Sequence, residues 1–598
     1  MSKKLVKAGL LGGAIALLSA TTGVQAQTSQ ASATDAQAAA DSLVPVRKLT
    51  AIKTAMRDGA NLVSDVYLPE AEGKYPVILI RSPYRMRNGP MADTILPLAQ
   101  WFAGKGYAVV VQDVRGTGDS DGTFDFLPQE PKDGYDSIES LAVQPWANGK
   151  LCMMGYSYLG AVQWLAAKEM PPHLTCMAPT AATGALLDEV PAIGGAFMTQ
   201  FGLQWPRMVL SKEGRSGGRV DWNALLQKRP LLTLADDQGE GPARLYRKLL
   251  EHDTLDEYWK PAHLTNAEIA RVNIPIMETT GWFDGDQPGE LFYWRGIESR
   301  ATPSPDQFLV IGPWVHAETF NGGHEKQGKM LLSKDSIIDN RAMHLAFFDH
   351  YLKGTAPKPD WPRVRLFITG ANEWRTFSAF PPKEAKLRPF YLSSGGKANS
   401  LSGDGTLSWE KPGKQAADKY TFDPHNPVPL GYGDTFGGDR TDVHKRPDVL
   451  VYTSTALAKP VEIIGEVAVE LYAATDARDT DFTASVSDVA PDGTSIVLGS
   501  RPVGIIRARY RNGPMAKPSL LTPGKVEKYR VNLQGIGHRF LPGHRIRVEV
   551  SSGAYPMFTP NQNTGNPIAT DTEWKVAKQT IFHDSIRPSA ILLPVVDD

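Results

Sequence analysis

The sequence predicts an α/β fold, in which a parallel sheet is covered by helices on both faces, followed by a C-terminal β-sandwich. Three observations support this prediction. Continuous apolar runs alternate with helical patterns in the first half of the chain, a helical stretch interrupts them, and short alternating segments fill the region after residue 363. At 598 residues the chain is also long enough for two or three domains.

The first apolar runs predict a sheet that begins with an antiparallel pair of strands. Residues 49–67 alternate around the turn Arg57-Asp58-Gly59. The later runs are apolar throughout, as parallel strands buried on both faces should be, at residues 75–81, 107–113, 150–154 and 173–179. Helical patterns lie between them at residues 92–105 and 133–144.

Beyond the fourth buried strand the pattern changes twice. Helical segments such as 221–228 and 243–252 predominate first, strands at 274–281 and 307–312 follow, and no strong helix appears after residue 363. The last region is typical of a jelly-roll β-sandwich. We therefore divide the chain into the first part of an α/β core at residues 48–183, a helical cap at 184–270, the second part of the α/β core at 271–362 and the jelly roll at 363–598.

The N-terminus has the pattern of a secretory signal peptide. Three lysines precede an apolar stretch at residues 8–20, which is too short to span a bilayer, and a small-residue cleavage site ends at Ala26. Residues 1–26 would then be removed, and residues 27–47 would form a polar linker. We expect a periplasmic or secreted protein with no membrane span after cleavage.

Composition excludes several classes of function. The formal net charge of −1 offers no basic surplus for binding nucleic acid. Cys152 and Cys176 are the two cysteines, and their apolar, strand-like surroundings favour buried free thiols, although export would permit a disulfide. With no Cys/His cluster at zinc-site spacing, we expect neither a metal nor a cofactor.

The segment from Gly155 to Gly160 carries the strongest functional signal. It places Ser157 on a glycine-flanked turn between a predicted strand and a predicted helix. A serine in that position is the nucleophile elbow of an α/β-hydrolase, where a tight turn lifts the hydroxyl out of the sheet. The alternative is a Gly-rich turn whose serine caps the helix, so the motif needs support from the rest of the chain.

That support comes from an acid and a base that follow the serine in the expected order. Asp284 and His316 each lie on a loop directly after a predicted strand. His316 would accept the proton of Ser157, and Asp284 would orient and stabilise the imidazole. Asp286 is a competing acid, but we favour Asp284 because Asp-Gly directly after the strand gives a tight turn that aims the carboxylate at a histidine. His324 is a competing base, but it lies past a Gly-Gly pair, where it would be mobile, so we favour His316.

Acyl transfer also needs two hydrogen-bond donors for the oxyanion. The backbone N–H of Tyr158, directly after the serine, is the first. Tyr84 ends the strand that feeds the oxyanion loop in this fold, and its phenol hydroxyl is the candidate for the second. A packing role for Tyr84 after Pro83 is an equal alternative from the residues alone.

Further motifs accompany these residues in a fixed order, at residues 82–84, 113–122, 133–136, 144–146, 155–160, 281–285 and 312–316. With them the chain resembles the cocaine-esterase / X-prolyl dipeptidyl-peptidase family of serine hydrolases, over roughly residues 48–590. Relatives include α-amino acid ester hydrolases and glutaryl acylases.

The resemblance implies a three-part architecture of α/β-hydrolase, helical cap and jelly roll. It implies Ser157 as nucleophile, His316 as base and Asp284 as acid, and an oxyanion hole made by the Tyr84 hydroxyl and the Tyr158 backbone N–H. The family fits the prediction of an exported serine hydrolase that cleaves a small-molecule ester or amide through an acyl-enzyme.

Family members differ in substrate, so the pocket residues matter. Trp146 resembles an aromatic residue that flanks the acyl pocket, although a core position is an equal alternative. Asp188 and Glu189 are candidates to hold a substrate α-amine, although an acidic pair at a helix start usually caps the helix. Aryl esters, α-amino acid esters or β-lactam amides, and X-Pro peptides therefore stay open as substrates.

A different class of function is a carbohydrate-binding protein on an inactive hydrolase scaffold, because jelly rolls also occur in lectins. The complete set of Ser157, Asp284 and His316 argues against it. The sequence leaves open whether the protein forms a homo-oligomer.

Overall fold

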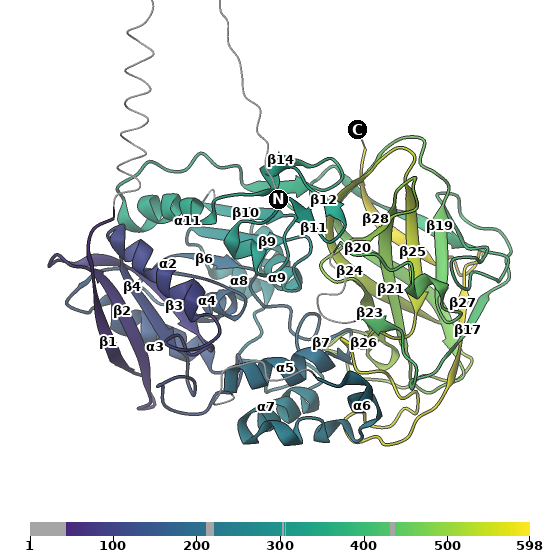
Figure 1. The fold of residues 1–598 in the computed structure, drawn as a ribbon, viewed down its shortest axis with the longest axis horizontal. Coiled ribbons are helices and arrows are strands. Elements are labelled where there is room, and N and C mark those ends of the chain that lie inside the picture. The colour runs from purple at the N-terminus through teal and green to yellow at the C-terminus, as the bar shows by residue number, and fades with distance from the viewer. Residues whose placement is uncertain (1–42, 211–219, 302–303, 305, 431–436, 598) are drawn as a thin grey trace, which may run out of the picture.

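The computed structural model describes residues 43–210, 220–301, 304, 306–430 and 437–597. The predicted signal peptide and nearly all of the predicted linker lie outside these residues. The described chain forms an α/β domain, a group of helices beside it, and a β-rich C-terminal domain (Figure 1). Within the described ranges, none of the helices combines the length and apolar character that a bilayer crossing requires.

The α/β domain is built on one mixed sheet. Its strands lie in the order β1 (Val46–Ala55), β2 (Asn61–Pro69), β4 (Ala108–Asp113), β3 (Tyr75–Ser82), β5 (Ala147–Tyr156), β6 (Leu174–Thr180), β9 (Ile276–Gly281), β10 (Gln307–Gly312), β13 (Val364–Ile368), β14 (Glu373–Phe377). From β4 to β13 in this order, neighbouring strands run parallel. The antiparallel pairs lie at the two edges of the sheet.

Helices cover both faces of this sheet, as the alternating sequence pattern predicts. One face carries α2 (Ala92–Gly104) and α11 (Asn340–Phe348), whose Phe102 and Phe348 rings lie 5.7 Å apart. The other face carries α3 (Glu130–Ala142), α4 (Tyr158–Lys168) and α9 (Gln287–Glu298). A short helix α10 (Glu318–Asn321) follows β10.

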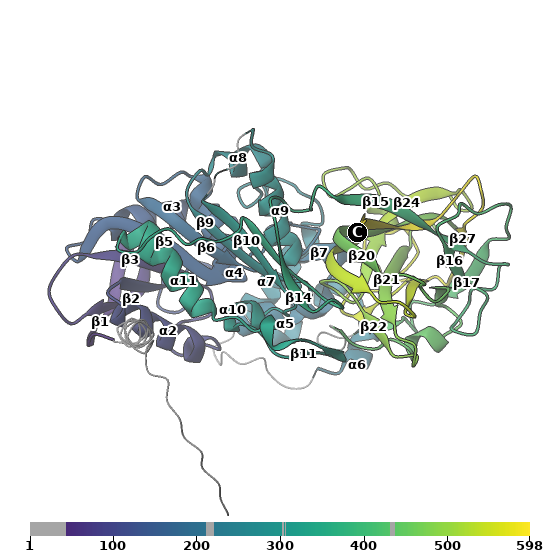
Figure 2. The same ribbon diagram turned by 90° about the horizontal axis from the view of Figure 1, so that it is seen from above.

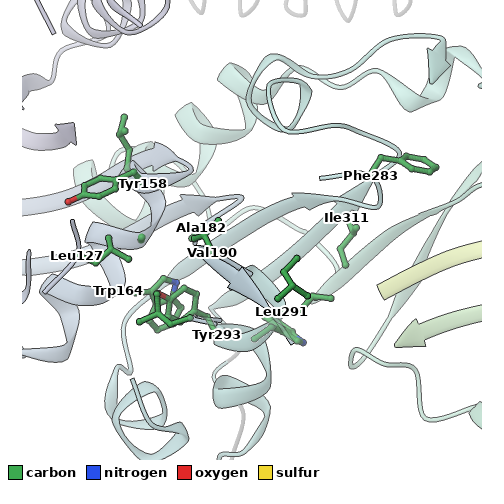
Figure 3. Close-up of a cluster of buried hydrophobic side chains, with 14 of the residues drawn as sticks. Leu127, Tyr158, Trp164, Ala182, Val190, Phe283, Leu291, Tyr293 and Ile311 are labelled. Atoms are coloured by element: carbon green, nitrogen blue, oxygen red, sulfur yellow. The ribbon is translucent and has the colours of Figure 1, made fainter. Parts of the chain in front are cut away.

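The core between the sheet and the second group of helices is dense. Trp164 of α4 stacks on Tyr293 of α9, with ring centroids 4.6 Å apart and an interplanar angle of 7°. Figure 3 shows these two rings facing each other beneath Ala182 and Val190. Since α4 follows the predicted nucleophile and α9 follows the predicted acid, this contact fixes two elements that carry the site.

The region predicted as a helical cap holds α5 (Thr199–Leu210), α6 (Trp222–Gln227), α7 (Glu240–Glu251) and α8 (Asn266–Arg271). Helices α5 and α7 pack together, and Phe197 meets Tyr246 of α7 edge to face. In Figure 1, α5, α6 and α7 lie together along the lower side of the molecule, next to both larger domains.

The C-terminal domain contains β-strands and, among its described residues, no helix longer than a 3-10 turn. Its large sheet is made of β15 (Ala385–Ser393), β16 (Thr406–Ser408), β17 (Asp418–Phe422), β19 (Leu450–Ser454), β20 (Val461–Thr475), β21 (Asp481–Val489), β22 (Ser495–Val497), β23 (Gly504–Arg507), β24 (Glu527–Phe540), β25 (Arg545–Ser551), β27 (Ala577–Phe582) and β28 (Ala590–Val596). Figure 2 shows this domain against the β10–β14 side of the α/β domain.

Short two-stranded pairs complete the described strands. They are β7 (Ala192–Ile193) with β8 (Ala196–Phe197), β11 (Lys326–Gln327) with β12 (Met330–Leu331), and β18 (Pro429–Leu430) with β26 (Tyr555–Pro556).

The expectation of two free thiols is wrong. Cys152 of β5 and Cys176 of β6 are direct partners on adjacent parallel strands, with Cα atoms 4.7 Å apart, and they form a disulfide. The sequence places both cysteines in buried strands, but it does not give the register that brings them opposite each other.

Candidate active site

Ser157 lies on a strained turn between β5 and α4. Its backbone has φ 64° and ψ −129°, a conformation that side chains rarely adopt. The neighbouring glycines leave the necessary space. A Cβ on Gly160 would lie 2.8 Å from Cβ of Ala182, and a Cβ on Gly155 would lie 2.6 Å from Cβ of Leu159. This is the geometry of a nucleophile elbow.

The predicted acid and base meet at the carboxyl end of the sheet. Asp284 follows β9 and His316 follows β10, and these two strands are parallel neighbours. Nδ1 of His316 lies 2.8 Å from Oδ1 of Asp284, whose side chain is fully buried. The competing base His324 is 72% exposed, and its ring faces Glu318 at 3.6 Å rather than Asp284.

Asp286 lies between the serine and the histidine. Its Oδ2 is 3.5 Å from Oγ of Ser157 and 3.8 Å from Nε2 of His316, and it accepts a hydrogen bond from the Thr183 hydroxyl at 3.0 Å. The sequence suggested Asp286 only as a rival to Asp284. The structure places the two aspartates on opposite edges of the same imidazole ring.

These carboxylates change the proton affinity of the site. Burial alone would lower the pKa of His316, but Asp284 and Asp286 raise it to about 9. Burial also raises the pKa of Asp286, an effect that the positive charge of His316 opposes. The imidazole is therefore held mainly as imidazolium near neutral pH when the cavity is empty.

Two donors point toward the space above Ser157. Burial raises the pKa of Tyr84 well above its usual value, so the phenol stays protonated. Its oxygen accepts a hydrogen bond from Nε1 of Trp205 at 3.2 Å, and the phenol is also hydrogen-bonded with the Ser157 side chain, which places it next to the nucleophile. The N–H of Tyr158 is at the first position of α4, where the helix supplies no acceptor.

The hydroxyl of Tyr158 points away from this space. Its one proton lies between two acceptors, the carbonyl of Phe126 at 2.9 Å and the buried carboxylate of Glu130 at 2.8 Å, and Glu130 pairs with the equally buried Arg81 at 2.6 Å. Because Arg81 is in the strand that leads to Tyr84, one buried network fixes both oxyanion candidates.

A cavity of about 740 Å³ opens above these groups. Its walls combine aromatic and aliphatic side chains with few polar ones, as small-molecule sites usually do. The apolar side includes Phe126, Val190, Phe201, Trp205 and Met208. Sequence reasoning missed these residues, because three of them come from α5 and nothing in the sequence fixes the orientation of that helix over the sheet.

Two pocket predictions are wrong. Trp146 directly precedes β5, at the opposite end of the strand from Ser157, and it does not line the cavity. Asp188 and Glu189 do not line it either. Glu189 lies behind the wall, where its Oε2 accepts the backbone N–H groups of Gly184 and Ala185 at 2.9 and 3.1 Å.

Among the described residues, Asp284, Asp286 and His316 are the group whose donor atoms, all within 4.8 Å of one another, are close enough for a metal ion. One of these atoms, Nδ1 of His316, is already hydrogen-bonded to Asp284. Ser157 and His316 line the same cavity, and the hydrogen bond to Asp284 orients the imidazole there.

Comparison with known proteins identifies the family of this chain. Residues 58–318 match the X-Pro dipeptidyl-peptidase family S15, and residues 359–592 match the C-terminal non-catalytic domain of X-Pro dipeptidyl-peptidases. The chain is 34% identical to a cocaine esterase from Rhodococcus over 90% of its own length and 97% of that protein. It is 25% identical to a putative serine esterase from Mycobacterium bovis, covering 83% and 89%.

Solved structures share the whole architecture. An aminopeptidase from a Thaumarchaeota archaeon superposes with a TM-score of 0.81 at 26% identity, covering 92% of this chain and 96% of the other. An α-amino acid ester hydrolase superposes with a TM-score of 0.79 at 28% identity, covering 92% and 97%. These likenesses confirm the predicted fold class and the resemblance that the motifs indicated.

Proposed function

Because this chain belongs to the S15 and cocaine-esterase family of serine hydrolases, we propose that it cleaves an ester or amide of a small acyl group through Ser157, His316 and Asp284. The observation that carries the proposal is the 2.8 Å Asp284–His316 pair, set beside a strained serine at the floor of a 740 Å³ cavity. In this assignment Tyr84 and the Tyr158 N–H form the oxyanion hole.

The reaction would run in two balanced halves. His316, in its neutral form, takes the Ser157 proton as Oγ bonds to the acyl carbon, and the Tyr84 hydroxyl and Tyr158 N–H hydrogen-bond the oxyanion. The bond to the leaving alcohol or amine then breaks, and His316 returns the proton to it. Water then loses a proton to His316 as its oxygen bonds to the acyl carbon; the bond from that carbon to Oγ breaks, and His316 returns the proton to Oγ, which releases the acid and free Ser157.

Replacing Ser157 tests the assignment. Ser157→Ala should lower kcat by about 10⁴-fold or more and abolish labelling by a fluorophosphonate, with the fold unchanged, because the nucleophile is lost. The measurement is hydrolysis of p-nitrophenyl esters and X-Pro anilides by wild type and variant. Full turnover by the pure variant would contradict the proposal, and the preferred substrate set separates esterase from X-Pro peptidase activity.

A specific observation favours substrates with an α-amine. The Asp286 carboxylate lines the cavity 3.5 Å from the nucleophilic oxygen, and it is hydrogen-bonded with the buried Glu189 carboxyl. An ammonium group next to the acyl carbon would meet Asp286 directly. We therefore assign amine recognition to Asp286 in place of Asp188 and Glu189. Structural likeness to an α-amino acid ester hydrolase and to an aminopeptidase supports this assignment.

Two matched esters test the amine. Phenylacetyl and D-phenylglycyl methyl esters differ mainly by that group. Wild type should prefer the aminated ester, and Asp286→Asn should reduce this preference about tenfold or more in kcat/KM, since a neutral amide keeps the shape but loses the charge. The neutral ester is the internal control. An unchanged preference in Asp286→Asn would move the amine site elsewhere.

We also propose export to the periplasm or the medium, on the basis of the signal-peptide pattern at residues 1–26. The purified exported protein should begin at Gln27. A cytoplasmic protein that keeps Met1 or its neighbours would overturn this proposal.

A further inference from the structure

We propose that Arg501, from the C-terminal β-domain, is a positioning residue for the reaction at Ser157. Its guanidinium holds the loop that carries Asp284 and Asp286, and its charge balances the carboxylates around the site. The proposal rests on the triad assigned above. It gives a functional role to a domain whose family is described as non-catalytic.

Arg501 reaches the acid loop from the other domain. It lies between β22 and β23 and is 5% exposed, and one terminal nitrogen donates a hydrogen bond to the Gly285 carbonyl at 2.7 Å. Gly285 stands between Asp284 and Asp286. The hydrogen bond therefore fixes the peptide unit that sets the directions of the two carboxylates flanking His316.

The guanidinium also packs against the face of this loop. A Cβ placed on Gly285 would lie 3.5 to 3.6 Å from three guanidinium atoms, which is ordinary van der Waals contact. The loop is thus supported from beneath by a planar, rigid group at the residue between the two acids.

The charge of Arg501 has no close partner. Among the described residues, none of the carboxylates comes within the 4.0 Å of an ion pair with it, and its Nε makes no hydrogen bond. A buried cation without a partner is costly, so its place needs another source of stabilisation. That source is the pair of acids at longer range, Asp188 and Asp286, whose pKa values burial raises and Arg501 lowers.

Other charged groups face this pair from every side. Asp284 and His316 act on Asp286, and the buried Glu290 interacts with both aspartates. Arg295 acts on Asp188 and is itself paired with Glu466. His316 and Arg501 are the cations that act on Asp286. Because His316 must become neutral to act as a base, Arg501 is the cation that remains to keep Asp286 ionised at that moment.

Arg501 also acts on His316 directly. Its positive charge disfavours the imidazolium and so opposes the two aspartates that raise the pKa of His316. Without Arg501 that pKa should rise, since Asp286 stays ionised for as long as the imidazolium lies beside it. The acid limb of the rate profile should therefore move to higher pH.

The test compares three variants by their pH profiles. Arg501→Gln should lower kcat for phenylacetyl methyl ester about tenfold, with a smaller change in KM, and shift the acid limb of kcat/KM to higher pH. Arg501→Lys, which keeps the charge, should restore the limb toward that of wild type even where kcat stays low. Arg440→Gln is the matched control, because Arg440 is a buried arginine that pairs with Glu549 inside the same domain.

The outcomes separate the possible roles. Arg440→Gln should lower the melting temperature and leave the pH limb in place. If Arg501→Gln behaves like that control, and Arg501→Lys shows a wild-type profile and kcat, Arg501 is structural and the proposal is overturned. Failure of the triad assignment would appear differently, as turnover and fluorophosphonate labelling that survive in Ser157→Ala.

Discussion

At the scale of single residues, Trp205 has two functions in the proposed site. Its ring stacks on Tyr158 and Phe201, with centroids 5.9 and 5.5 Å away, and so forms a wall of the acyl cavity. Its N–H also donates to the Tyr84 oxygen. This hydrogen bond holds the Tyr84 hydroxyl beside Ser157, with which it is also hydrogen-bonded, in the space where an oxyanion would form.

Trp205→Phe separates these functions. Phenylalanine keeps an aromatic wall but lacks the N–H, so the Tyr84 hydroxyl should lose its preferred orientation. We expect kcat to fall about 3- to 10-fold, the equivalent of one neutral hydrogen bond, with KM changed less. Steady-state kinetics on phenylacetyl methyl ester measures both values.

Phe201→Leu is the contrasting variant, because it alters the same wall without touching Tyr84. Its effect should appear mainly in KM. If the two variants give the same division between kcat and KM, the hydrogen bond to Tyr84 has no role in orienting the donor.

At the scale of elements, the sequence predicts the positions of those site residues that directly follow a strand. Ser157, Asp284, His316 and Tyr84 each follow a strand whose apolar run is visible in the sequence, and parallel strands bring their carboxyl ends to one edge. A candidate site residue can therefore be predicted from the sequence where it directly follows such an apolar run.

The sequence does not predict what depends on register or on packing between separate elements. The Cys152–Cys176 disulfide needs the offset of β5 against β6, and the aromatic wall needs the orientation of α5 over the sheet. Trp146 was misplaced for a related reason. Its motif is near the elbow in sequence, but the length of β5 separates it from Ser157.

At the scale of the whole molecule, the C-terminal domain contacts the residues on both sides of the acid loop. Trp282, two residues before Asp284, packs against Gly537 of β24, whereas its indole N–H donates at 2.6 Å to the Phe367 carbonyl of β13, within the sheet of the α/β domain. Gln287, three residues after Asp284, exchanges hydrogen bonds with Gly535 of the same strand at 2.8 and 3.1 Å. The α/β domain thus supplies the acid, and the β-domain holds the loop in place.

Gly537→Ala tests this coupling from outside the catalytic domain. A Cβ there would lie 2.5 Å from Cζ2 of Trp282, so the indole must shift and carry the acid loop with it. We expect a loss of roughly 1–3 kcal/mol in unfolding free energy and a lower kcat for the protein that remains folded. Thermal unfolding measures the change in stability. Titration of the active sites with a fluorophosphonate gives the number of folded sites, from which kcat per site is calculated.

Gly413→Ala is the matched control. With nothing within 4 Å of its new Cβ, it should change neither the stability nor kcat. A destabilised Gly537→Ala with wild-type kcat per site would mean that the domain contact stabilises the fold without positioning Asp284.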